Sequence, residues 1–210
     1  MIVFTDDSSA IAPFTVFSPA HCATLGALTI ANAAFLILAA RTFSPYRGRI
    51  IRLTLASLLI SLEIGEHAWE LAHSRWDVLT SLPLNLCRIG VFLTALLLVS
   101  KRQWLYDLCY FWSIGGSLNA LITPTLSGFG FPHFLFFKFF ISHDLLLVSV
   151  LYLAAVEGMR PSWRSVARAL AVTHAYALAV MAFDFAVGAN YLYLKSNPGG
   201  ATLLAPFGEW

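Results

Sequence analysis

The stretch "LPLNLCRIGVFLTALLLVS", residues 82–100, is long and apolar enough to cross a lipid bilayer. A membrane-spanning helix needs about 20 mainly apolar residues to cross about 30 Å of hydrocarbon. The stretch nevertheless opens with Pro83, Asn85, Cys87 and Arg88. An arginine inside a membrane is costly, and by default it faces a protein interior where an acidic partner neutralises its charge. The stretch therefore predicts a membrane helix that carries a polar site at its beginning.

The composition of the whole chain indicates the same class of protein. Of the 210 residues, 59% are hydrophobic and 11% are charged, which is too little charge to cover the surface of a soluble domain of this length. We therefore expect an all-α fold, in which residues 1–210 form one transmembrane domain. Its six predicted helices span about residues 21–40, 53–71, 82–100, 104–123, 133–156 and 165–187.

The basic residues predict how these helices are oriented in the membrane. Nine of the 13 lysine and arginine residues lie in or beside the first, third and fifth loops: Arg41, Arg47, Arg49 and Arg52, then Lys101 and Arg102, then Arg160, Arg164 and Arg168. The second loop has one arginine, Arg75, and the fourth loop has no charge. Because basic loops stay on the cytoplasmic side, both termini are expected outside. The C-terminal segment 190–210 has too few apolar residues in a row to span the membrane, so we expect it to fold over the external mouth as a lid.

The predicted helix 53–71 has an acidic face. Glu63, Glu66, His67 and Glu70 lie within about 100° of arc, since successive residues of a helix are rotated by about 100°. We expect Arg88 to pair with Glu66 or Glu70, because an unpaired arginine at that depth costs about 2.5 kcal/mol or more. A simpler interpretation of the acidic face is a polar seam that holds neighbouring helices together.

Further polar residues are expected between the external surface and the middle of the membrane. They are Asn119 in the fourth helix, His143 and Asp144 in the fifth, and Asp184 in the sixth. With Cys87 they predict a polar cavity in the outer half of the membrane. Taken alone, one cysteine in a membrane helix is more often a packing residue, and one histidine is more often structural.

No motif predicts a cofactor, a metal or a nucleic acid partner. The three cysteines, Cys22, Cys87 and Cys109, lack the spacing of a metal site, and no P-loop, GxSxG or dinucleotide fingerprint is present. We therefore expect no cofactor and no metal, and we expect membrane lipids as partners. The oligomeric state is left open.

Five motifs carry a resemblance to a known family. They are "LPLNLC" (82–87), "YFWSIGGSLNALITP" (110–124), "FPHFLFFKFFISHDLLL" (131–147), "VEGMRPSWRSVARAL" (156–170) and "ANYLYLKSNPGGATLL" (189–204). In this order they resemble the YwaF-like bacterial membrane proteins, from about Ile50 to the C-terminus. The resemblance implies a bacterial plasma membrane. YwaF-like proteins are in turn similar to a eukaryotic acyltransferase that moves polyunsaturated acyl chains from phosphatidylcholine onto lyso-ether phospholipids, and more distantly to androgen-induced-protein hydrolases of fatty-acid esters.

The resemblance also implies a catalytic pair. In the acyltransferase, a cysteine early in one helix acts with a histidine two helices later, and these positions match Cys87 and His143. An imidazole can take the proton of a thiol, and a cation such as Arg88 favours the thiolate. Asn85 or Asn119 can donate a hydrogen bond to an oxyanion.

We therefore expect a membrane enzyme of lipid acyl transfer or lipid-ester cleavage, which acts on a phospholipid or lysophospholipid through an acylated cysteine. Two other classes stay open. One is a small-molecule or proton-coupled transporter, with the acidic helix 53–71, His174 and Asp184 as a proton relay. The other is a membrane protein that binds lipid without catalysis.

Overall fold

The computed structural model describes residues 2–4, 13–124, 126 and 128–196, and all regular structure in that part of the chain is helical, as the sequence predicts. The helices are α1 (Pro19–Arg41), α2 (Pro45–Ala72), α3 (Leu86–Ser100), α4 (Gln103–Trp112), α5 (Leu118–Ile122), α6 (Phe134–Ala155) and α7 (Trp163–Val187). A π-helical turn, η3 (Ser113–Ser117), joins α4 to α5 without a break. Two short 3-10 turns are η1 (Ile2–Phe4) and η4 (Tyr191–Tyr193). Each long helical rod overlaps a helix expected from the sequence.

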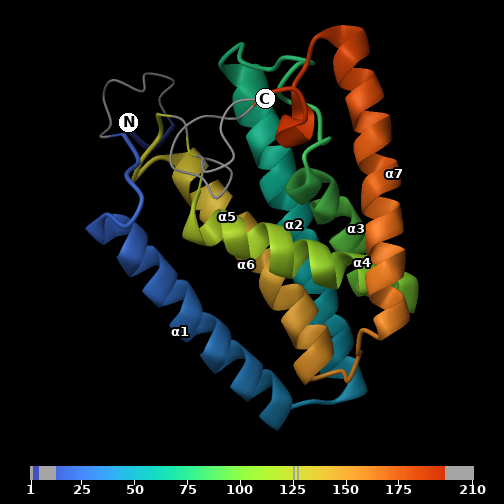
Figure 1. The fold of residues 1–210 in the computed structure, drawn as a ribbon. Coiled ribbons are helices and arrows are strands. Elements are labelled where there is room, and N and C mark those ends of the chain that lie inside the picture. Colours follow the sequence, from blue (N-terminus) through green and yellow to red (C-terminus); the bar gives the residue numbers. More distant parts are fainter. Residues whose placement is uncertain (1, 5–12, 125, 127, 197–210) are drawn as a thin grey trace.

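Five of the long elements pack into one bundle, and α1 lies along its side (Figure 1). α2 packs mainly against α3 and α6, and α4 packs against α3 and α7. Apolar side chains fill the space between α2, α3 and α6, among them Leu59, Leu97, Leu98, Val150 and Leu153, all fully buried. Because α6 contacts both α2 and α3, it is the central helix of the bundle.

Three helices in the described residues, α1, α6 and α7, are long and apolar enough to cross a membrane. α1 and α7 bury little of their apolar surface inside the protein, whereas α6 buries most of its own. A large exposed apolar surface on a helix of this length is suited to contact with lipid chains. The structure therefore agrees with a membrane protein in which α1 and α7 lie at the outside of the bundle.

Two helix boundaries differ from those expected. α2 begins at Pro45 and not near residue 53, because Ser44 caps the helix by accepting a hydrogen bond from Arg47 N at 3.3 Å and a proline is favoured in the first turn. α3 begins at Leu86 and not at residue 82, because Pro83 disfavours helical geometry in the residue before it and Asn85 is the N-cap, with extended backbone angles. Cys87 is therefore the second residue of its helix.

A buried carboxylate fastens three helices together at the end of the bundle away from Cys87. Glu157, which follows α6, binds Arg52 of α2 at 2.6 Å and Lys101, at the end of α3, at 2.5 Å. The hydroxyl of Tyr152 donates to the same carboxylate at 3.0 Å. Burial alone would raise the pKa of Glu157, but its hydrogen bonds with Lys101 and Arg52 outweigh that effect and lower the pKa.

Candidate functional site

Cys87 lies where the beginning of α3 meets the π-helical turn η3. A Cβ atom added to Gly116 of that turn would lie 3.7 Å from Cys87 Sγ. The Cys87 side chain lines a cavity of about 10 Å³, which is room for about one water molecule. The other lining residues come from α3, α4, η3 and α6: Leu86, Gly90, Thr94, Cys109, Trp112, Ser113, Ser117 and Leu146. The thiol therefore lies at a junction of helices and not on a plain lipid-facing surface.

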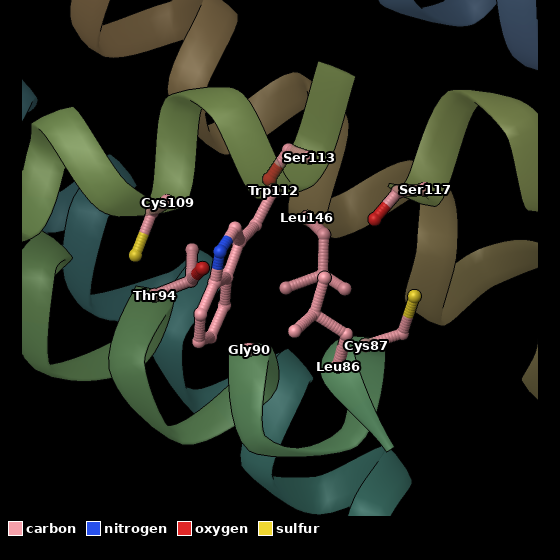
Figure 2. Close-up of a pocket in the computed structure, with 9 residues that line it drawn as sticks. All are labelled: Leu86, Cys87, Gly90, Thr94, Cys109, Trp112, Ser113, Ser117 and Leu146. Carbon is pink, nitrogen blue, oxygen red and sulfur yellow. The ribbon is translucent and has the colours of Figure 1, made fainter. Parts of the chain in front are cut away.

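The two ends of this cavity differ in chemistry. Figure 2 shows Cys87 and Ser117 together at one end and Cys109 with Thr94 at the other. The Ser117 hydroxyl lies on the same side of the cavity as the Cys87 thiol, and the Thr94 hydroxyl lies on the same side as the Cys109 thiol. All three cysteines are free. Cys87 is partly exposed, whereas Cys109 is buried, so of these two thiols Cys87 is the more accessible.

A buried ionic network begins at the residue next to Cys87. Arg88 Nε lies 3.2 Å from Glu63 Oε1, and Arg88 Nη2 lies 2.6 Å from Glu66 Oε2 and 3.6 Å from Glu70 Oε1. Its Nη1 donates to the carbonyl of Ser81 at 2.7 Å. The ion pair expected between Arg88 and the acidic face of α2 is thus present, and Glu63 takes part in it as well.

A second cation joins this network from the central helix. Lys138 of α6 binds Glu63 at 3.1 Å and also pairs with Glu66. His67 is the most exposed member of the network, although it is still partly buried; its Nε2 lies 3.7 Å from Glu63 and its Nδ1 lies 3.4 Å from Glu70. Two cations from α3 and α6 therefore face three carboxylates of α2 in a site of low exposure. The sequence signal for Lys138 was its isolation in the apolar run "FLFFKFFI" (134–141).

His143 lies on α6, the helix that supplies Lys138 to the ionic network and Leu146 to the cavity. It is five residues after Lys138 and three before Leu146, which lines the cavity. Its Nδ1 lies 2.7 Å from the carbonyl oxygen of Phe139, and the two rings lie 4.2 Å apart. A carbonyl only accepts hydrogen bonds, so Nδ1 carries the proton of the neutral ring and Nε2 keeps its lone pair. The hydrogen bond and the ring contact of His143 are with Phe139 of its own helix, and in the described part of the chain neither kind of contact joins it to Cys87.

The two asparagines expected at the site have partners elsewhere. The Oδ1 atom of Asn85 accepts a hydrogen bond from Leu192 N at 3.0 Å. The Oδ1 atom of Asn119 accepts from the hydroxyl of Thr123 at 3.0 Å, within its own helix end. In each case the side-chain oxygen is used for structure, and the amide nitrogen is the group that remains to donate.

The two aspartates of the expected site lie apart from the ionic network. Asp144 Oδ1 accepts a hydrogen bond from Asn32 of α1 at 2.6 Å, so this residue attaches α1 to the bundle. Asp184 of α7 is fully buried, and its carboxylate oxygens have no hydrogen-bond partner in the described part of the chain. The ion pairs therefore bring together Glu66, Glu70 and Arg88 but neither aspartate.

The chain after α7 folds back onto the loop that leads into Cys87. The Tyr191 hydroxyl donates to Val78 O at 2.8 Å and accepts from Leu82 N at 3.0 Å. The Tyr176 hydroxyl of α7 donates to Leu84 O at 2.8 Å. Burial raises the pKa of Tyr191, which keeps this hydroxyl protonated as a donor. Of the lid expected over 190–210, Tyr191 and Leu192 contact this loop, and residues 197–210 lie outside the described residues.

The helical fold and its buried charges define the class of this protein: it is an integral membrane protein, built as an α-helical bundle with a polar interior. Within that class the chain belongs to the TMEM164 family, whose sequence profile matches residues 16–210. No curated protein and no solved structure matches the chain significantly. Among the described residues, no group of three or more His, Cys, Asp or Glu side chains is arranged to hold a metal ion.

Proposed function

We propose that this protein is a membrane enzyme that transfers or cleaves lipid acyl esters, with Cys87 as the nucleophile and His143 as the general base. The observation that carries the proposal is the surroundings of Cys87. Cys87, a partly exposed residue, lies in the first turn of a helix, lines a small and mostly apolar cavity together with Ser117, and adjoins a buried ionic network that also reaches the helix of His143. A helix N-terminus favours negative charge, as a thiolate nucleophile requires.

The chemistry follows from the free nitrogen of His143. Nε2 accepts the proton of the Cys87 thiol as Sγ attacks the ester carbonyl of a lipid. The tetrahedral oxyanion collapses, the bond to the alcohol oxygen breaks, and the proton passes from His143 to that oxygen. The products are a lysolipid and an acyl thioester on Cys87. In the second half the hydroxyl of an acceptor lipid, or water, gives its proton to Nε2, attacks the thioester and releases the thiol.

The proposed substrates are phospholipids and lysophospholipids, which reach the site from the bilayer. Support comes from the exposed apolar surfaces of α1 and α7 and from the motif resemblance to YwaF-like proteins and the lyso-ether phospholipid acyltransferase. We further propose six membrane spans with both termini outside, because the basic residues gather in alternate loops. This orientation places Cys87 in the outer half of a bacterial plasma membrane.

The experiment is a search for the acyl-enzyme. The purified protein in detergent micelles is incubated with a phospholipid that carries an isotope-labelled acyl chain, and intact-protein mass spectrometry follows. We expect one labelled acyl group on Cys87, which hydroxylamine removes. Cys87→Ser and His143→Ala should each lose most of the adduct, and the double variant should be little worse than either, as expected of residues that act as a unit.

Two matched variants serve as controls for this experiment. Cys22→Ser removes an exposed thiol, and Cys109→Ser removes the buried thiol at the far end of the cavity. Both should keep the adduct on Cys87. The assignment of Cys87 would be wrong if the Cys87→Ser variant still formed the hydroxylamine-sensitive adduct. It would also be wrong if this variant turned over lipid as fast as the wild type.

A transporter that uses the acidic face of α2 as a proton relay is the second candidate function. The buried carboxylates of Glu63, Glu66 and Glu70 favour it. Arg88 and Lys138 already neutralise two of these charges, which makes the carboxylates poorer proton carriers than unpaired ones. Proteoliposomes that carry an internal pH dye test it, because a transporter acidifies or alkalises the lumen whereas an acyl transferase leaves the lumen unchanged.

A further inference from the structure

The π-helical turn η3 brings a buried hydroxyl to the proposed nucleophile. Ser117 is the last residue of the turn and is 1% exposed. A hydroxyl in an apolar interior needs a hydrogen-bond partner, because burial without one costs free energy. Ser117 and Cys87 both line the cavity, and their side chains lie at the same end of it in Figure 2, which brings the hydroxyl near the thiol.

The backbone geometry explains how Ser117 comes to face Cys87. In a π-helix each turn holds about one residue more than an α-helical turn, so the residues that follow are rotated by about 100° relative to an uninterrupted α-helix. Ser117 would therefore point in another direction if α4 continued as a regular helix. The backbone of the turn lies close to the thiol, because a Cβ atom added to Gly116 would be in van der Waals contact with Cys87 Sγ at 3.7 Å.

We propose that Ser117 is a positioning residue, which donates a hydrogen bond to the sulfur of Cys87 and orients it for attack on the acyl carbonyl. The proposal rests on the assignment of Cys87 as the nucleophile. Ser117 itself exchanges no atom with the substrate: its hydroxyl hydrogen stays on Oγ, while the thiol proton passes to His143. The hydrogen bond holds the sulfur in one rotamer and stabilises negative charge on it.

The test measures the reactivity of Cys87 with iodoacetamide, which needs no lipid substrate and no turnover. The full-length protein in detergent micelles is alkylated over a range of pH, and mass spectrometry of the Cys87 peptide gives the rate. Because a hydrogen bond to a charged group is worth about 1.5–3 kcal/mol, Ser117→Ala should slow alkylation at neutral pH by about tenfold or more. At high pH, where every thiol is ionised, the Ser117→Ala rate should approach that of the wild type, so the rate curve moves to higher pH.

Three further variants distinguish the effect of losing the hydroxyl from the effect of altered packing. Ser117→Gly removes the same hydroxyl and should match Ser117→Ala. Ser117→Thr keeps a hydroxyl and should restore most of the wild-type rate at neutral pH. Ser113→Ala is the control, because Ser113 begins the same turn and lines the same cavity but lies apart from Cys87 in Figure 2. Its alkylation curve should equal that of the wild type.

The outcomes distinguish this inference from the proposed function. If Ser117→Ala and Ser117→Gly both alkylate like the wild type at every pH, Ser117 does not position the sulfur, whether or not an acyl-enzyme forms. Equal slowing by Ser113→Ala would also overturn the inference, since the effect would then come from packing of the turn. A shifted rate curve in a protein that forms no acyl adduct would keep the Ser117 contact and reject the acyl transfer mechanism.

Discussion

Replacing Arg88 with alanine tests whether the buried ionic network holds α2, α3 and α6 together. The substitution removes a guanidinium that lies 3.2 Å from Glu63, 2.6 Å from Glu66 and 3.6 Å from Glu70, and that also donates to Ser81 O. Lys138 would then be the one cation of the network left for three carboxylates. Removing one partner of a buried ion pair costs about 3–5 kcal/mol, because the remaining charge is uncompensated. For a chain of this length each 1 kcal/mol lowers the melting temperature by about 2–4 °C, so we expect a loss of about 6–20 °C.

The assay is thermal unfolding in detergent micelles, followed by circular dichroism and by exposure of buried cysteines to a fluorescent maleimide. Glu66→Gln should also destabilise the protein. Arg88→Ala combined with Glu66→Gln should lose less stability than the two single variants added together, by about 0.5–3 kcal/mol, because the second substitution removes a charge that the first left unpaired. Arg164→Ala, an exposed arginine of α7, is the control and should change stability by less than about 0.5 kcal/mol. Strict additivity, or a loss below 1 kcal/mol for Arg88→Ala, would refute the pairing argument.

Three further predictions concern orientation, the second cluster and the C-terminal segment. On a Cys22→Ser background in intact cells, a cysteine at Thr80 should react with a membrane-impermeant maleimide and one at Arg102 should not; the reverse pattern would invert the topology. Glu157→Gln should destabilise the protein by about 3 kcal/mol at pH 7. The pKa of Glu157 is lowered in the folded state, so the stability difference between the wild type and Glu157→Gln should be fully present above pH 4.5, the ordinary pKa of a glutamate. Below that pH the difference should shrink, and a difference that grew at low pH would contradict the assignment. Tyr191→Phe should lower the free energy of unfolding by about 1–3 kcal/mol, because Val78 O and Leu82 N each lose a partner, and an unchanged melting temperature would mean that water replaces the hydroxyl.

The parts of the fold that could be predicted from the sequence are those set by local properties. Apolar runs of membrane-spanning length predicted the helices. The free-energy cost of a buried charge predicted the ion pair of Arg88 with the acidic face of α2. A local signal for the early start of α2 was also present in the sequence. Ser44 is a typical N-cap residue, and Pro45 is a typical first residue of a helix. That signal was outweighed by the basic residues around it, which suggested a loop.

The features that could not be predicted depend on contacts between distant residues. The oxygen of Asn85 accepts a hydrogen bond from the backbone of Leu192, which is 107 residues away in the chain, and no local pattern indicates this contact. The π-helical turn η3 has no simple signature in "SIGGS", because such a turn forms where packing against neighbouring helices stabilises it. The position of Ser117 beside Cys87 is therefore visible only in three dimensions.

The position of Cys87 is controlled from three directions, and this bears on how a membrane thiol can be reactive. Arg88, the next residue, is attached to α2 and through Glu66 to α6. The loop before Cys87 is held by the hydroxyl of Tyr191, and the π-helical turn brings Ser117 to the same end of the cavity as the thiol. A catalytic group must be kept close to its productive geometry, because small displacements slow a reaction steeply. Lipid chains supply no hydrogen bonds, so a membrane enzyme has to take this rigidity from its own polar groups. The ionic network, which alone would be a polar seam between helices, has in this way a second role: it fixes the helix start on which the thiol lies.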